Sequence, residues 1–355
     1  MDSKIWFMEG LSSQRDIIEG VREFSRHQQQ EITIFASHRH ARNEILSHAD
    51  YALLEPTEEK ERLAFITSLV KRENISAIQA GRNSAWFESN RQQIESLGVK
   101  LTTGAMNIET LRLADDKYAF SQRMAQHGLA VVPSLRVDSI DELKAFIANN
   151  PFNNESLCVK PIKGIYGMGF WRFDETVSPM AAFTHPESRR VNSRFYLQAL
   201  EEAESFEPMV LMPYLPGPEY SVDMVVEQGH VVAAVARRKE GALQHLEITG
   251  EAFELGCACA KVMQADGIVN VQTRQNAQGE AVLLEINMRP SGGIGYTQHS
   301  GINLPGIFVS RQLGLMSQEE ALAEKNKFTP AIIRSITNSI SYSSLKTNLI
   351  STDKN

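Results

Sequence analysis

Three glycines and two lysines occur in residues 157–170, which begin and end with short apolar runs. Glycine lacks a Cβ atom, so a turn containing Gly164, Gly167 and Gly169 lets backbone N–H groups approach a phosphate chain. Lys160, at the end of the first apolar run, can add a positive charge on a phosphate oxygen. The same residues can instead form a plain hairpin whose glycines only serve turn geometry. The segment alone leaves both interpretations open.

Oxygen-bearing side chains recur in residues 268–287, which the pattern predicts to be two strands joined by a loop. Side chains alternate along a strand, so Glu285 and Asn287 project to one side, and an even-numbered loop would bring Gln272 to the same face. Such ligands suit Mg²⁺, and Arg289 beyond them could neutralise a transferring phosphoryl group. A solvated strand face is the alternative, and it is favoured for Gln272 in isolation.

A third segment, residues 210–223, contains an extended run that ends in a proline-rich turn before Glu219. An extended backbone can recognise adenine with one carbonyl and one N–H group, and a nearby carboxylate can accept hydrogen bonds from ribose hydroxyls. Taken alone, this segment could equally be an ordinary loop.

The first hundred residues must position any such site through strands that alternate with helices. We expect strands at 5–8, 32–36, 51–54, 77–80 and 99–102, and helices at 14–26, 58–71 and 90–97. This alternation predicts a mostly parallel, doubly wound sheet. No Gly-x-Gly-x-x-Gly follows the first strand, so a dinucleotide fingerprint is absent there.

After a predicted helix at 108–127, the pattern changes to strands joined by hairpins with helices between them, which is typical of an α+β unit. We expect strands at 157–160, 169–173, 209–214, 220–227, 230–238, 268–274 and 281–287, and helices at 140–149, 192–204 and 252–265. The Ser/Asn-rich tail after about residue 335 is expected to be peripheral.

The composition of the chain argues against several classes of protein. The chain has 355 residues and a net charge of −7, which argues against broad nucleic-acid or anionic-membrane binding. It has no apolar run long enough to span a membrane and no signal peptide at its start, so we expect a cytoplasmic protein. Its three cysteines are too few for a disulfide framework or a four-thiolate zinc site.

Taken together and in order, these features resemble the ATP-grasp superfamily. The matching motifs are Asp116-Lys117, Lys160 with its glycine-rich turn, Leu-Pro-Gly-Pro-Glu-Tyr-Ser-Val-Asp at 215–223, Gln272, and Glu-Ile-Asn-Met-Arg-Pro-Ser-Gly-Gly at 285–293. The likeness covers about residues 1–315. It is nearest to the carbamoyl-phosphate-synthase-type carboxylate–amine ligases, in a short stand-alone form.

The resemblance implies an α/β plus α+β fold in which a Rossmann-like pre-ATP-grasp domain precedes a two-lobed ATP-grasp fold. It places the first domain at 1–105, a small lobe with the glycine-rich loop and a linking helix at 106–205, a central lobe with the metal site at 206–320, and a C-terminal extension at 321–355.

The resemblance also implies roles for single residues. Lys117 and Lys160 would contact phosphates, Glu219 the ribose, and the Pro213 carbonyl and Leu215 N–H group the adenine. The other nucleotide contacts expected are Lys163, Gly164, Gly167, Gly169, Met212 and Tyr214. Gln272, Glu285 and Asn287 would hold Mg²⁺, which Mn²⁺ could replace, with Arg289 beside them. Because this metal set carries one negative charge, we expect metal binding to depend heavily on ATP.

The activity implied is ligation of a small-molecule carboxylate to an amine through an acyl-phosphate, driven by ATP. Arg237 and Arg238 are candidates for binding the substrate carboxylate, and Arg238 is the one we place in the catalytic set. A pair of solvent-facing basic residues is at least as good an interpretation. The alternative function is a regulatory or assembly protein that binds nucleotide without turnover. A homodimer is a guess from base rates.

Overall fold

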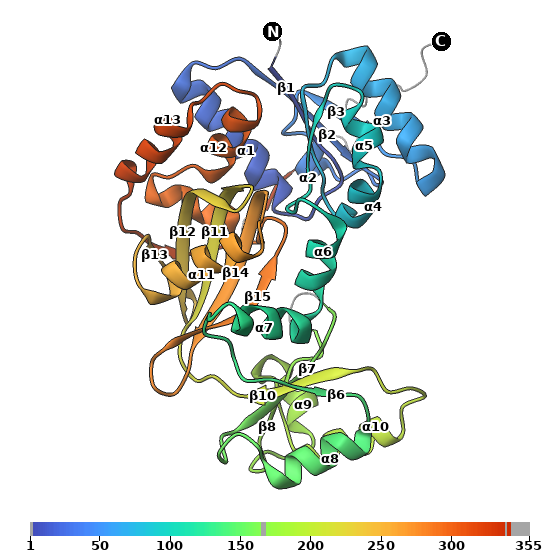
Figure 1. Ribbon diagram of the computed structural model, residues 1–355, viewed down its shortest axis with the longest axis vertical. Helices are drawn as coiled ribbons and strands as arrows, with labels where there is room; N and C mark the ends of the chain where they lie inside the picture. Colours follow the sequence, from blue (N-terminus) through green and yellow to red (C-terminus); the bar gives the residue numbers. More distant parts are fainter. Residues whose placement is uncertain (1–2, 165–167, 338, 342–355) are drawn as a thin grey trace. The chain divides into compact units, whose positions relative to one another are not determined.

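The computed structural model describes residues 3–164, 168–337 and 339–341 of the chain (Figure 1). Its contacts divide the chain into two compact units. The first unit contains Met1–Leu111, Tyr220–Val271 and Ile286–Asn355, and the second contains Arg112–Glu219 and Gln272–Glu285. Each unit is therefore built from separate stretches of the sequence.

The first unit opens with a parallel sheet of five strands in the order β3-β2-β1-β4-β5. The strands are β1 (Ser3–Phe7), β2 (Ile32–His38), β3 (Tyr51–Leu54), β4 (Ala77–Gln79) and β5 (Lys100–Thr102). The helices between them are α1 (Gln14–Gln28), α2 (Asn43–Leu46), α3 (Glu59–Glu73), α4 (Ser84–Ser89) and α5 (Arg91–Glu95). The predicted doubly wound sheet is confirmed, although α2 and α4 were not expected.

Alternation along β1 explains the layers of this sheet. Ile5 and Phe7 pack into the core that contains α1 and the buried helix α12 (Leu304–Gln312). Trp6 and Met8 point to the opposite face, against α3, α4 and α5. Both faces of a parallel sheet must be covered, and neighbouring residues of one strand supply the two apolar surfaces.

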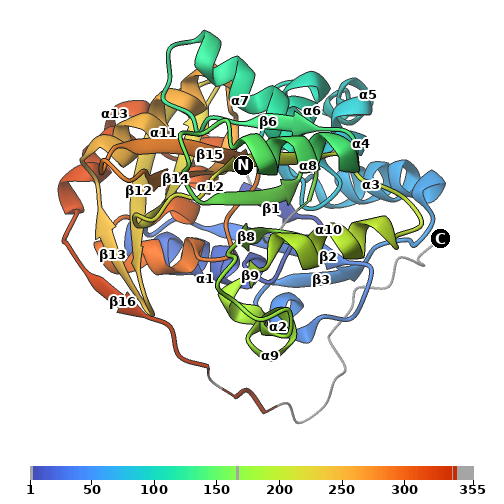
Figure 2. The same cartoon turned by 90° about the horizontal axis from the view of Figure 1, so that it is seen from below.

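The second sheet lies in the second unit and has the order β6-β10-β7-β8-β9. Its strands are β6 (Leu135–Val137), β7 (Leu157–Pro161), β8 (Trp171–Phe173), β9 (Arg190–Val191) and β10 (Met209–Pro213). One face packs against the neighbouring helices α8 (Ile140–Asn149) and α10 (Ser193–Glu201), which lie side by side (Figures 1 and 2). The short helices α9 (Ala181–Thr184) and η1 (Pro186–Ser188) precede β9.

The third sheet has six strands in the order β15-β14-β11-β12-β13-β16. Its strands are β11 (Glu219–Glu227), β12 (His230–Glu240), β13 (Leu243–Glu247), β14 (Gly267–Gln275), β15 (Ala281–Asn287) and β16 (Ile332–Arg334). The later helices are α11 (Glu251–Val262), η2 (Ile294–Ser300), α12, α13 (Gln318–Ala323) and η3 (Glu324–Lys327). Strand β15 runs over the residues that the sequence predicted.

The single helix predicted at 108–127 is wrong, because two helices occupy this region. They are α6 (Ile108–Asp115) and α7 (Lys117–Gln126). Asp116 between them is extended, and its side chain accepts a hydrogen bond from the Ala119 N–H group at 2.8 Å. An aspartate that caps the next helix ends the preceding one, since its backbone leaves the helical region.

Two further differences concern element ends. The predicted strand at 169–173 begins only at Trp171, because Gly169 has a positive φ of 73°. The predicted helix at 192–204 is shorter at both ends, with Asn192 as its N-cap. Within the described ranges, none of the helices has the length and apolar character that crossing a membrane requires.

Candidate active site

A pocket of about 270 Å³ lies entirely within the second unit. Residues from α7, the β7–β8 region, the end of β10 and the β14–β15 pair line it. Eight of the nucleotide-binding residues that the sequence predicted are among them: Lys117, Lys160, Gly164, Met212, Pro213, Tyr214, Leu215 and Glu219. Gln272 and Glu285 also line it. Side chains from distant parts of the sequence therefore converge in one cavity.

Lys160 reaches the pocket because of alternation along β7. Val159 packs into the core beneath α8 and α10, whereas Cys158 and Lys160 lie on the other face and line the pocket. Burial lowers the pKa of Lys160, and Glu285 opposes this shift. Among the described residues, the Lys160 ammonium has no hydrogen-bond or ion-pair partner, while its backbone pairs with Val210 of β10. Its ammonium group is therefore available to an anionic ligand.

Lys117 is held at the first turn of α7. Its backbone N–H group donates to the Ile162 carbonyl at 3.3 Å, and its ammonium donates to the Gly164 carbonyl at 2.8 Å. The same ammonium lies 4.0 Å from the carboxylate of Glu285. These contacts join α7, the glycine-rich turn and β15 around one cation.

The end of β10 presents two backbone groups to the pocket, the Pro213 carbonyl, which accepts a hydrogen bond from the Cys158 thiol at 3.7 Å, and the Leu215 N–H group. The Tyr214 N–H group donates to the Ser156 carbonyl at 2.6 Å, on the side of β7. Peptide groups alternate along an extended chain, so the Pro213 carbonyl and the Leu215 N–H group point the other way. Pairing of β10 with β6 ends at Leu211, so these groups lie beyond it. The backbone thus offers one acceptor and one donor side by side.

Glu219 stands next to an arginine that sequence reasoning missed. A guanidinium nitrogen of Arg274 lies 3.8 Å from the Glu219 carboxylate, and Arg274 also donates to the Gly217 carbonyl at 3.0 Å. The guanidinium of Arg274 lies 5.6 Å from the centre of the Tyr214 ring. Arg274 comes two residues after Gln272 on β14, so strand alternation could have found it.

Only part of the glycine-rich turn enters the pocket. Gly164 lines it, whereas Lys163 and Gly169 do not. A Cβ atom on Gly169 would lie 2.6 Å from a ring carbon of Pro161, so both space and its positive φ require glycine there. Gly167 lies outside the described residues.

Gln272 and Glu285 provide oxygen donors from two neighbouring strands. Leu283, two residues before Glu285, fixes β15 through backbone hydrogen bonds to Ala130 at 2.9 Å and Val132 at 3.2 Å. No group of three histidine, cysteine or acidic residues that could hold a metal occurs in the part of the chain that the structure describes. Any metal here would rest on one carboxylate, amide oxygens and the ligand itself.

The remaining predicted residues belong to the first unit and are not among those that line this pocket. They are Asn287, Arg289, Arg237 and Arg238. Arg238 forms ion pairs with Glu247 at 2.8 Å and Glu240 at 3.0 Å. Arg237 is only 3% exposed and bonds to side chains of its own unit.

Comparison with known proteins identifies the fold of the chain. Residues 205–337 match a family model described as "ATP-grasp in the biosynthetic pathway with Ter operon". No curated protein matches the sequence. Many solved structures share the fold, and all three described next are less than 20% identical to this chain.

Carboxyaminoimidazole ribonucleotide synthase from Aspergillus clavatus, complexed with ATP, is 15% identical, with a TM-score of 0.63 over 90% of this chain and 79% of that one. The biotin carboxylase domain of 2-oxoglutarate carboxylase from Hydrogenobacter thermophilus is 16% identical, with a TM-score of 0.63 over 90% and 72%. L-amino acid ligase from Bacillus licheniformis is 13% identical, with a TM-score of 0.59 over 90% and 76%. The chain therefore has the ATP-grasp fold, preceded by a Rossmann-like domain, and the predicted fold is confirmed.

Proposed function

We propose that this protein is an ATP-dependent carboxylate–amine ligase and that ATP binds in the pocket of the second unit. The observation that carries the proposal is the convergence of two lysines, a backbone acceptor and donor at Pro213 and Leu215, and the side-chain oxygens of Gln272 and Glu285 in one cavity. The names of the structural relatives support it, since they include a carboxyaminoimidazole ribonucleotide synthase, a carboxylase and an amino acid ligase.

In this proposal, adenine bonds to the Pro213 carbonyl and the Leu215 N–H group, and ribose hydroxyls donate to Glu219. Lys117 and Lys160 bind phosphate oxygens. Burial lowers the pKa of Lys160 because it removes water that would stabilise the charged ammonium group. A bound phosphate would replace this lost stabilisation. The triphosphate therefore meets two cations that the fold already holds in place.

Gln272, Glu285 and Asn287 are the residues that would hold Mg²⁺, or Mn²⁺ in its place. When bound, the ion would offset negative charge on the nucleotide phosphates. The donor set fits this hard cation, because it consists only of oxygens and Mg²⁺ takes few protein ligands, completing its shell with water and phosphate. Asn287 follows Glu285 by two residues on β15, so the two side chains share a face of the strand.

The reaction needs no protein nucleophile. A carboxylate oxygen of the substrate attacks the γ-phosphorus, the bond to ADP breaks, and an acyl-phosphate forms. An amine nitrogen then attacks the acyl carbon and loses a proton, phosphate leaves, and an amide remains. Positioning and charge stabilisation dominate phosphoryl transfer, and we assign them to Lys117, Lys160 and Arg289.

The test is release of ADP and phosphate by the purified protein with Mg²⁺ and pools of acids and amines. We expect release that requires one acid and one amine together. Tight nucleotide binding without turnover on any pair would contradict the ligase proposal and support the regulatory alternative.

A further inference from the structure

The segment that carries Asn287 and Arg289 is in close contact with a glycine that follows the last strand of the first sheet. Gly104 follows β5 and has a φ of 96°. A Cβ atom there would lie 2.0 Å from the Met288 carbonyl oxygen and 2.6 Å from its carbon. The Gly104 carbonyl also accepts a hydrogen bond from the Asp266 N–H group at 3.0 Å. No residue other than glycine can bring these two backbones so close.

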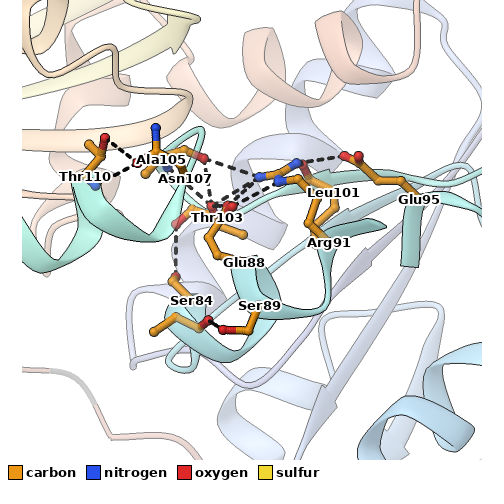
Figure 3. A network of polar contacts seen from close by, with 11 residues as sticks. Ser84, Glu88, Ser89, Arg91, Glu95, Leu101, Thr103, Ala105, Asn107 and Thr110 are labelled. Carbon is orange, nitrogen blue, oxygen red and sulfur yellow. Dashed lines mark hydrogen bonds and ion pairs between the residues drawn. The ribbon is translucent and has the colours of Figure 1, made fainter. Parts of the chain in front are cut away.

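A network of polar contacts fixes the loop that holds Gly104 (Figure 3). Arg91 donates to the Leu101 carbonyl at 2.9 Å and the Ala105 carbonyl at 3.3 Å, on either side of Gly104. The Thr103 hydroxyl donates to the Ala105 carbonyl at 2.9 Å and also bonds to Glu88. The Glu88 side chain is 3% exposed and forms an ion pair with Arg91. Partly buried hydrogen bonds to the charged side chains of Arg91 and Glu88 thus hold the backbone that contacts Met288.

Arg237 contacts the same segment at Ser291, three residues after Met288. Its Nε donates to Asp223 at 2.7 Å, one terminal nitrogen to Gln244 at 2.6 Å, and the other to the Ser291 hydroxyl at 2.9 Å. Ser291 in turn accepts the Gly293 N–H group at 3.2 Å. A Cβ atom on Gly293 would lie 2.5 Å from a guanidinium nitrogen of Arg237. The guanidinium is therefore packed and bonded on several sides.

We propose that Gly104 and Arg237 are positioning residues that fix the segment 287–293 and thereby orient Asn287 and Arg289 for the reaction. This inference rests on the proposed function, because it gives Asn287 and Arg289 their roles. Neither Gly104 nor Arg237 touches a reacting atom. Their contacts with Met288, Ser291 and Gly293 hold the backbone of the segment in one conformation. Small displacements of a catalytic group lower the reaction rate strongly.

Gly104→Ala tests the first contact, and Gly98→Ala is its matched control. Gly98 has a similar φ of 84°, yet a Cβ atom there would meet nothing within 4 Å. Both variants place a Cβ atom at a similar positive φ, so their difference reports mainly the clash with Met288. We expect Gly104→Ala to speed hydrogen exchange of the amides in 287–293 and to lower kcat roughly 100-fold. The dissociation constant of ATP should stay within about threefold of wild type.

Arg237→Lys tests the second contact, since lysine keeps the charge but cannot bond to Asp223, Gln244 and Ser291 together. We expect kcat to fall at least roughly tenfold with the KM for ATP unchanged, and exchange in 287–293 to rise. Equal behaviour of Gly104→Ala and Gly98→Ala, or faster exchange with unchanged kcat in both tests, would overturn the inference. If the wild-type protein turns over no substrate, the proposed function fails, while the exchange data still show whether the two contacts fix the segment.

Discussion

The ammonium of Lys117 lies 4.0 Å from the carboxylate of Glu285 and donates at the same time to the Gly164 carbonyl. A cation, an acid and the start of the glycine-rich turn are thus tied together on the wall of one pocket. The acid restrains the lysine but also opposes any phosphate that approaches it. A bound cation would remove this opposition, which gives Glu285 two effects of opposite sign.

Glu285→Gln separates these two effects. With Mg²⁺ present, we expect ADP release to fall about 100- to 1,000-fold, because the only carboxylate of the proposed metal set is lost. Without divalent ions, we expect the variant to bind ATP more tightly than wild type, because the negative charge beside the two lysines is gone. Calorimetry with and without a chelator measures both.

Glu280→Gln is the control for this experiment. Glu280 is exposed, precedes β15 and bonds to the Asn276 side chain at 2.9 Å. We expect wild-type behaviour in both assays. If Glu285→Gln also behaves like wild type with Mg²⁺, Glu285 has no part in the reaction.

Lys160→Met should separate stability from nucleotide binding. Burial lowers the pKa of Lys160 in the folded protein below its ordinary value of 10.5. Between the lowered pKa and 10.5, the unfolded chain therefore binds more protons than the folded one. Stability contributed by this group therefore rises with pH across that window. We expect the variant to be at least as stable as wild type at neutral pH, with the difference shrinking toward about pH 10, while ATP affinity falls.

Denaturant unfolding at several pH values, combined with ATP titration, checks this expectation. A variant that loses stability at neutral pH and regains it at alkaline pH would show that attraction to Glu285, rather than burial, dominates at Lys160.

Glu219 can be tested with nucleotides that lack ribose hydroxyls. Wild-type protein should bind 2′,3′-dideoxy-ATP roughly tenfold more weakly than ATP, because hydrogen bonds to a carboxylate are lost. Glu219→Ala should bind both nucleotides with the same, weaker affinity. Undiminished discrimination in the variant would remove Glu219 from the ribose site.

Acid stability provides a test that is independent of nucleotide. A hydrogen bond from Thr176 and the guanidinium of Arg190 lower the pKa of Asp174 from 3.8 to about 2. Because the folded value is the lower one, this stabilisation is complete above the unfolded pKa and is lost as pH falls through the folded one. We expect Asp174→Asn to be less stable than wild type at neutral pH, with the gap closing near pH 2. Urea unfolding from neutral pH down to that value measures it.

The sequence predicted the parts of the molecule whose periodicity is simple. Strand alternation indicated β15 and its Glu285, and the proline-rich turn indicated the end of β10. The sequence could not show that Asp116 divides the predicted helix in two. An aspartate can lie within a helix or cap the start of one, and only the structure shows that its side chain caps α7. Helix α12 was missed because seven of its nine residues are buried, so no polar stripe marks it.

The contacts between residues far apart in the sequence could not be predicted either. Arg237 and Arg238 look alike in the sequence, yet one is enclosed by Asp223, Gln244 and Ser291 while the other forms surface ion pairs. Likewise, nothing near Gly104 in the chain indicates that it presses on Met288, which lies in a distant part of the sequence. Such pairings depend on how the sheets pack.

One consequence concerns inhibitors. Cys158 lines the pocket beside Pro213, and burial raises the pKa of its thiol to about 12. The thiolate is the reactive form of cysteine, and almost none exists here at physiological pH. An adenine mimic that carries an electrophilic warhead would therefore find no nucleophile in this sulfur. Compounds against this pocket would gain more from reversible affinity for the backbone groups at Pro213 and Leu215 than from a warhead directed at this cysteine.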